Sequence, residues 1–326
     1  MGRDASNQSQ PMMVLYIAGV GRSGSTLLER ILGAIPGFVN AGELVALFPR
    51  VAMQDQRCGC GQPFSMCPYW RSIGAHGFSG WDPERVQRIA ELQPRVVRQR
   101  FIPYLLAPRT ASPQFRRDLG EYVEAYRDLY TSIAEVSGAR VLVDASKSLA
   151  QLFALRHIAG LDLRVLNLVR DSRGVAHSWS KTNIKMPQVR DPEALMRTYA
   201  PHRLAVMWSA LQMESALLRS LATHSARIRY EDLVANPRTA LEGVLTALDL
   251  PPRSGWLDHV DGSSATLDSS HGLAGSRSRF KTGRIEMNLD DDWRSTLAPG
   301  PRRLVTTLTL PQLASYGYLG SARVSR

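Results

Sequence analysis

Apolar and polar residues alternate along the 326-residue chain with two different periods. Short runs of aliphatic and β-branched residues have the length and composition of buried parallel strands. These runs are Val14–Ala18, Phe38–Val39, Val141–Asp144, Leu163–Val169 and Ala226–Arg229. Between them, apolar residues recur at helical spacing. Helices are predicted over residues 27–32, 82–100, 114–137, 149–158, 175–179, 192–222 and 237–250, and the last helix is expected to start at 290–293. This alternation predicts a single α/β domain with a central parallel sheet.

Three stretches fall outside this alternation. Residues 1–11 are polar and predict a flexible tail, which leaves 12–326 as one domain. Residues 50–80 read as an irregular loop rich in Gly, Pro, Cys and aromatic residues. Together with the helices that follow, they predict an insertion over about 50–138 that shapes a binding pocket. Residues 253–284 are rich in Gly, Ser and Arg, which fits either a disordered basic loop or a loop that closes over an anion.

The segment between the first strand and the first helix is the Gly-rich loop Gly19–Thr26. A strand, a Gly-rich loop and a helix in this order form the P-loop arrangement, whose backbone N–H groups bind phosphate. The spacing of Gly19 and Gly24 matches a Walker A loop, but Ser25 stands where the Lys belongs. The absence of this Lys argues against ATP or GTP hydrolysis. The loop can still bind one phosphate-like group beside Arg22. The alternative is an ordinary strand–turn–helix joint.

Charged residues follow several of the predicted strands at the edge where ligands bind in such sheets. Glu43 follows the second strand and is either a carboxylate facing the loop or a surface residue of a helix first turn. Lys147 follows the third strand and is either a site cation or a solvated side chain. Arg170 ends the fourth strand, and Ser178 lies on the helix after it, so the two could share one phosphate.

Composition limits the partners. The formal net charge of +11 fits either a pocket for a polyanionic ligand or general attraction to polyanions. No block of five consecutive basic residues occurs, so nucleic acid is not the expected partner. No apolar run reaches about 18 residues, and no membrane span is expected. A cytoplasmic protein is the default expectation.

The cysteines Cys58, Cys60 and Cys67 lie close together in the sequence. Their odd number argues against a disulfide framework. A zinc site needs a fourth ligand, and His76 is near enough to consider, but the spacing is not a standard zinc pattern. A local structural role, or one disulfide under oxidising conditions, is the preferred interpretation, and no metal site is predicted.

Several motifs together resemble the 3′-phosphoadenylylsulfate (PAPS)-dependent sulfotransferases, over about residues 14–295. The Gly-rich loop is similar to their 5′-phosphosulfate loop, and Leu168–Lys181 is similar to their 3′-phosphate-binding strand and helix. RYEDL at Arg229–Leu233, and the segment His271–Trp293, are further matches. The loop G-x-G-R-S-G-S-T-L-L followed by A-G-E-L resembles the branch with tyrosylprotein and bacterial small-molecule sulfotransferases. The resemblance implies a P-loop-type three-layer αβα fold with a central parallel sheet and a helical insertion.

The resemblance also implies roles. Glu43 would be the general base, and Arg22 and Lys147 would stabilise charge on the transferring group. The nucleotide-binding residues would be Gly21, Arg22, Ser23, Gly24, Ser25, Thr26, Arg170, Ser178, Tyr230 and Arg277. PAPS would be the donor, adenosine 3′,5′-bisphosphate the product, and no metal would be required.

The acceptor is expected to be a hydroxyl of a small molecule. Unlike the tyrosylprotein enzymes, the chain shows no predicted membrane anchor and carries the Cys-rich insert, which argues against a protein-tyrosine acceptor. A homodimer is among the partners considered. Two other functions stay open: a P-loop kinase of a small metabolite, and a non-catalytic relative that binds nucleotides or polyanions.

Overall fold

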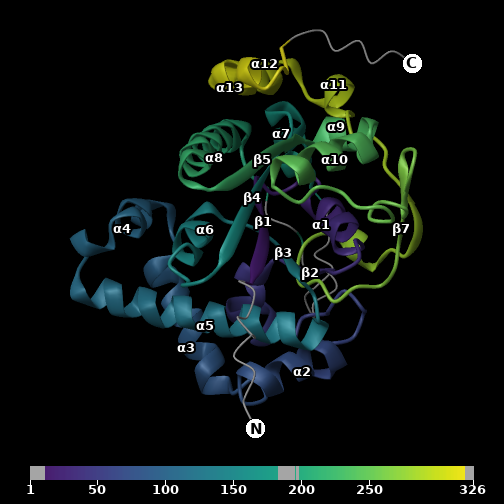
Figure 1. Cartoon of the computed structure of the whole chain (residues 1–326). Coiled ribbons are helices and arrows are strands. Elements are labelled where there is room, and N and C mark those ends of the chain that lie inside the picture. Colours follow the sequence, from purple (N-terminus) through teal and green to yellow (C-terminus); the bar gives the residue numbers. More distant parts are fainter. Residues whose placement is uncertain (1–11, 183–194, 196–197, 320–326) are drawn as a thin grey trace.

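The strand that precedes the Gly-rich loop is the centre of the sheet. The computed structural model describes residues 12–182, 195 and 198–319 (Figure 1). The main sheet contains five parallel strands in the order β2-β3-β1-β4-β5. They are β1 (Met13–Gly19), β2 (Phe38–Gly42), β3 (Val141–Lys147), β4 (Asp162–Val169) and β5 (His224–Arg229). Their carboxyl ends share one edge, which brings together the residues predicted to bind a ligand.

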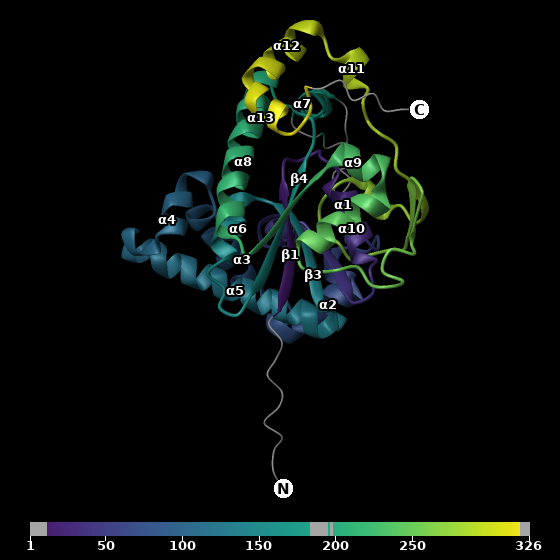
Figure 2. The same ribbon diagram turned by 45° about the horizontal axis from the view of Figure 1, so that its top comes forward.

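Both faces of the sheet are buried. Along β1, Val14 and Tyr16 enter one apolar core, and Leu15 and Ile17 enter the other. The first core lies under α6 (Leu149–Leu155) and α8 (Pro201–Leu221), and the second under α1 (Ser25–Gly33), α9 (Tyr230–Ala235) and α10 (Pro237–Ala247) (Figures 1 and 2). These layers confirm the predicted αβα architecture with a central parallel sheet.

A helical insertion connects β2 and β3. It contains α2 (Pro68–Gly77), α3 (Pro83–Val96), α4 (Ile102–Leu106) and α5 (Pro113–Ser137), joined by short helical turns. The prediction of an irregular loop over 50–80 is therefore wrong for α2. Pro68 starts this helix after an extended residue, and Trp70 and Ile73 bury its inner face. The helix is short and contains two glycines, so its apolar spacing is too weak to stand out in the sequence.

The basic segment 253–284 is not a disordered loop in the described structure. It contains β6 (Val260–Asp261) and β7 (Ser264–Leu267), which form a small antiparallel sheet with β8 (Gly283–Glu286). A 3₁₀ turn, η6 (Arg277–Phe280), lies between β7 and β8. Val260, Ala265 and Leu267 join the core under α1 and α10. Strands of two to four residues bury too few side chains to give a periodic signal.

The helix predicted over 192–222 and the last helix, predicted from 290–293, also differ from the structure. The helix expected over 192–222 begins at Pro201, because Ala200 before this proline is extended; most of 192–197 lies outside the described residues. Up to residue 319, where the described C-terminal residues end, the structure has three short helices instead of one: α11 (Trp293–Thr296), α12 (Pro299–Leu308) and α13 (Leu310–Ser315). No helix in the described ranges combines the length and apolarity needed to span a bilayer.

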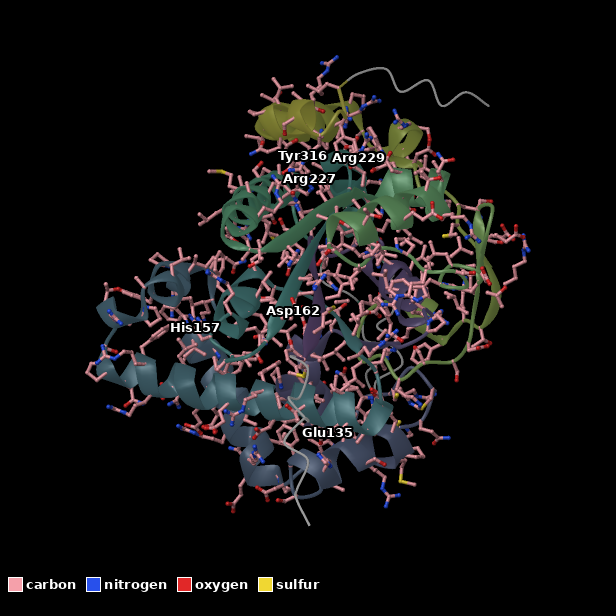
Figure 3. The ribbon with its side chains drawn as sticks, viewed as in Figure 1. Glu135, His157, Asp162, Arg227, Arg229 and Tyr316 are labelled. Carbon is pink, nitrogen blue, oxygen red and sulfur yellow. The ribbon has the colours of Figure 1, made fainter. Side chains whose placement is uncertain are left out.

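Cation–π contacts attach this C-terminal region to the sheet. The Arg227 guanidinium of β5 lies 4.2 Å from the centre of the Tyr316 ring, which follows α13. Arg229 makes the same contact with Tyr318 at 4.4 Å. Figure 3 shows Arg227, Arg229 and Tyr316 gathered where β5 meets the terminal helices.

Candidate active site

The Gly-rich loop forms a tight turn between β1 and α1. Gly24 caps α1 in the left-handed region at φ 90°, and Arg22 also has a positive φ of 72°. A left-handed conformation is costly for a residue with a side chain and is typical of ligand-binding turns. The Ser23 side chain is fully buried, and its Oγ has no hydrogen-bond partner among the described residues. A buried unpaired hydroxyl beside a helix N-terminus fits a bound anion.

Two aromatic side chains form the walls of this turn. Trp179 on α7 (Ser172–Ser180) donates from Nε1 to the Gly21 carbonyl at 3.1 Å. A Cβ atom at Gly24 would lie 2.8 Å from the Tyr230 ring. The close approach of Tyr230 and the positive φ together require glycine at position 24. Tyr230, predicted from the RYEDL motif, therefore lies against the loop.

Arg22, Arg170 and Ser178 meet beside the loop. Arg22 donates from Nε to Ser178 Oγ at 2.9 Å, and Arg170 donates from Nη1 to the Arg22 carbonyl at 2.8 Å. Burial lowers the pKa of Arg22 from its usual value, and the neighbouring Arg170 lowers it further. The buried guanidinium of Arg170 and the half-buried guanidinium of Arg22, next to a hydroxyl, can bind a doubly charged anion.

Asp290 supplies a carboxylate to this cluster. Arg170 Nη2 lies 3.0 Å from Asp290 Oδ2, and the guanidinium stacks 4.6 Å from the centre of the Tyr230 ring. An anion that binds here must share Arg170 with Asp290 or replace its carboxylate. Arg277, at the start of η6, is exposed, whereas Arg170 and Ser178 are buried.

Glu43 and Lys147 form an ion pair at the ends of neighbouring strands. Lys147 Nζ donates to Glu43 Oε1 at 2.5 Å, and the two side chains are 14% and 19% exposed. Both are held by unusual backbone: Gly42 before Glu43 has φ 79°, and Lys147 itself has φ 63°. A Cβ atom at Gly42 would lie 2.1 Å from the Leu273 carbonyl oxygen, so only glycine permits this approach. The Glu43 N–H donates to the same oxygen at 2.8 Å.

A buried carboxylate, that of Asp144, stabilises the turn next to this pair. Asp144 on β3 accepts hydrogen bonds from the Tyr130 hydroxyl at 2.7 Å and from the Ser146 N–H at 2.9 Å. Burial raises its pKa to about 6, although these hydrogen bonds favour the ionised form. Ser146 Oγ in turn accepts the Val45 N–H at 2.9 Å. Asp144 and Ser146 thereby fix the turn that carries Glu43, a role that no local sequence pattern predicts.

Two polar residues of α1, Glu29 and Arg30, have contacts that their local sequence does not predict. Arg30 is buried and donates to the Ser278 and Asp268 carbonyls at 2.7 and 2.9 Å, which holds segment 268–278 over the helix. Glu29 is 1% exposed and lies near Lys147 and Glu43. Adjacent Glu and Arg residues in a helix normally mark its solvent face. Only the position of the covering segment, over 200 residues later in the chain, buries them.

Burial raises the pKa of the Glu29 carboxyl from 4.5 to about 8; Lys147 opposes this shift, and Glu43 and Asp144 add to it. An acid with a higher pKa in the folded protein binds more protons when folded, so the free energy of unfolding falls as pH rises between these values. Glu29→Gln removes this pH-dependent loss of unfolding free energy, which amounts at most to about 5 kcal/mol. We expect the melting temperature of the variant to exceed that of the wild type at pH 8.5 by more than at pH 5. Equal differences at the two pH values would contradict this assignment.

The family of the chain follows from comparison with known proteins. The model of the Sulfotransferase family matches residues 15–254, and the chain belongs to this family. The fold is similar to the sulfotransferase domain from the Synechococcus PCC 7002 olefin synthase, with a TM-score of 0.52 and 21% identity over 94% of this chain and 95% of that one. The sulfotransferase domain from the curacin biosynthetic pathway gives 0.50 and 16%, over 93% and 98%. No protein with a curated description matches the chain.

Five of the predicted site residues form two hydrogen-bonded clusters. Glu43 with Lys147, and Arg22 with Arg170 and Ser178, are joined in pairs by hydrogen bonds over long sequence separations. Thr26 accepts the Ser276 N–H at 3.1 Å, which connects the loop to the segment before η6. Ser25 is buried at the start of α1. Arg277 is the predicted residue that lies at the surface.

Proposed function

We propose that the protein transfers a sulfuryl group from PAPS to a hydroxyl of a small molecule. The observation that carries this proposal is the arrangement of the Gly-rich loop. The ion pair of Glu43 and Lys147 lies near Thr26 of this loop. Arg170 and Ser178 form hydrogen bonds with Arg22 of the loop itself. PAPS carries phosphate at both the 5′ and the 3′ position. One group would lie in the loop and the other at Arg170 and Ser178.

Sulfuryl transfer resembles phosphoryl transfer in its physical demands. The acceptor oxygen attacks sulfur in line, a new S–O bond forms, and the bond to the bridging 5′-phosphate oxygen breaks. Negative charge grows on that bridging oxygen, and Arg22 and Lys147 would stabilise it. The loop residues Gly21, Ser23, Gly24, Ser25 and Thr26 would hold the 5′-phosphate through N–H groups and hydroxyls. The protein contributes positioning and charge stabilisation.

Glu43 would accept the proton of the acceptor hydroxyl. In the described structure Lys147 Nζ holds this carboxylate at 2.5 Å. When the donor binds, Lys147 would turn toward the transferring oxygens, and Oε1 of Glu43 would become free for the acceptor. The ion pair would in this way keep both groups in place before the substrates arrive.

The Ser23 hydroxyl, which has no partner among the described residues, and the buried Arg170 guanidinium fit the donor. The acceptor pocket would be formed by the helical insertion over about 50–138. We expect no role for metal in the transfer step, because Lys147 and the two arginines supply the positive charge. The missing Walker lysine at Ser25 weighs against a kinase.

Ligand-dependent melting separates this proposal from its alternatives. A ligand that binds the native state raises its stability by mass action. At 100 times its Kd, adenosine 3′,5′-bisphosphate should stabilise the protein by about 2.7 kcal/mol. ATP with Mg²⁺, and heparin, should give a clearly smaller shift at equal concentration. Stabilisation by Mg²⁺–ATP with turnover would indicate a kinase, and stabilisation by heparin alone a polyanion-binding protein. A labelled-sulfate transfer screen over phenols, sugars, nucleosides and lipids would then identify the acceptor.

A further inference from the structure

Three cysteines and one histidine meet where the insertion contacts the segment before η6. Their ligand atoms, the Sγ atoms of Cys58, Cys60 and Cys67 and a ring nitrogen of His271, all lie within 4.8 Å of one another. Cys67 Sγ is 3.6 Å from Cys58 Sγ, 3.7 Å from Cys60 Sγ and 3.3 Å from His271 Nδ1. Cys58 Sγ lies 3.6 Å from the same nitrogen. His271 lies more than 200 positions from the cysteines, so no local sequence pattern groups them.

These distances have the values of a tetrahedral metal site. With Zn–S bonds of 2.3 Å and a Zn–N bond of 2.0–2.1 Å, tetrahedral geometry places the sulfurs about 3.8 Å apart and the nitrogen about 3.6 Å from each sulfur. Four of the six separations lie within a few tenths of an ångström of these values. The other two, Cys58–Cys60 and Cys60–His271, are at most 4.8 Å. We propose that Cys58, Cys60, Cys67 and His271 bind one structural zinc ion.

A disulfide, and a zinc site completed by His76, were both considered from the sequence, and both fit the structure less well. None of the three cysteines forms a disulfide. Cys67 is almost equally distant from both other sulfurs, so the arrangement favours no single pair. His76, the fourth ligand considered from the sequence, instead forms an ion pair with Glu135 on α5, which Figure 3 labels. The geometry assigns the fourth position to His271.

The surrounding structure holds the four ligands in place. Cys58 and Cys67 are fully buried. The chain reverses between Cys58 and Gln62 through Gly61, which has φ 89°, and the Cys58 N–H donates to the Gln62 carbonyl at 2.8 Å. The His271 ring stacks on Tyr69 with centroids 4.6 Å apart, and Trp70 Nε1 donates to the His271 carbonyl at 2.8 Å. Four protein ligands complete the coordination, which is typical of a structural rather than a catalytic zinc site.

The ion would join two distant parts of the chain next to the candidate active site. Gly59 N–H donates to the Gly272 carbonyl at 3.1 Å, which continues the contact beyond the ligands. Two residues after His271, Leu273 donates to the Ala41 carbonyl and accepts the Glu43 N–H, at 3.0 and 2.8 Å. Zinc would therefore hold in place the segment around Leu273 that positions the Glu43 backbone. Its role is to hold this segment, not to act on a substrate.

Metal content of the purified full-length chain tests the site directly. The protein is expressed with added zinc, any affinity tag is removed, and zinc is measured by mass spectrometry. We expect one zinc ion per chain in the wild type, and less than about 0.1 in His271→Ala and Cys67→Ser, because each variant lacks a ligand. His76→Ala is the matched control and should keep the full content. Zinc-free wild type, or equal content in His271→Ala and His76→Ala, would overturn the proposal.

A second measurement does not depend on the folding of a variant. Wild-type protein in which cobalt(II) replaces zinc should show the intense visible bands of a tetrahedral site and thiolate-to-cobalt charge-transfer bands. Thiol titration should find three thiols that react slowly until a chelator removes the metal, since bound thiolates are protected. Weak bands of octahedral cobalt, or a disulfide found by mass spectrometry of the protein purified under reducing conditions, would refute the site.

Discussion

Replacement of Glu43 by glutamine is expected to lower kcat by about 10²- to 10⁴-fold, the usual contribution of a general base. Glutamine keeps the size of the side chain but cannot take the proton of the acceptor hydroxyl. Glu43 pairs with Lys147, whereas Ser178 pairs with Arg22. The affinity for adenosine 3′,5′-bisphosphate should therefore change by no more than about 2-fold. Steady-state kinetics and calorimetric titration measure the two quantities.

Glu29→Gln is the matched control for this variant. Both carboxylates lie near Lys147, but burial raises the pKa of Glu29 to about 8. At pH 7 Glu29 is therefore mostly protonated, and glutamine resembles the form already present. We expect kcat of this control to stay within about 3-fold of the wild type. If Glu43→Gln turned over normally, or if both variants lost activity equally, Glu43 would not be the base.

Replacement of Arg170 by alanine should have its main effect on binding. Hydrogen bonds to a charged group contribute about 1.5–3 kcal/mol, so the Kd for adenosine 3′,5′-bisphosphate should rise about 10- to 100-fold. The Kd for adenosine 5′-monophosphate should rise clearly less, because that nucleotide has no 3′-phosphate to lose contact with. Calorimetric titration of both nucleotides, at one ionic strength, gives the comparison.

Arg170 is buried and also holds Asp290 and the Arg22 carbonyl, so a loss of folding must be separated from a loss of contact. Arg170→Lys keeps the charge but not the two-pronged donor, and it should bind the bisphosphate with intermediate affinity. The melting temperature of each variant without ligand shows whether the site is intact. Equal losses for the two nucleotides in a folded Arg170→Ala protein would contradict the assignment to the 3′-phosphate.

The elements that were predicted correctly are those whose signal is local. β1 is a continuous apolar run, and β4 is mainly apolar, because both faces of the sheet are covered. The Gly-rich loop is evident because its backbone turns need glycine, as at Gly24 with φ 90°. The prediction failed for β6, β7 and β8, where pairing with neighbouring strands rather than periodicity gives the structure. It also failed at α2, whose apolar face is only two residues wide.

The sequence by itself determined the parallel sheet, the phosphate-binding turn and the kinds of side chain at its rim, because period, glycine and charge are readable within a few residues. Only the tertiary structure decided which of these side chains meet. It pairs Glu43 with Lys147, brings Arg22 to Ser178, buries Glu29 under a distant segment and adds His271 to the three cysteines. The pairs Glu43–Lys147, Arg22–Ser178 and Cys58–His271 join residues that are 104, 156 and 213 positions apart. Such contacts depend on how the strands are ordered and how the insertion packs, and no local pattern records either.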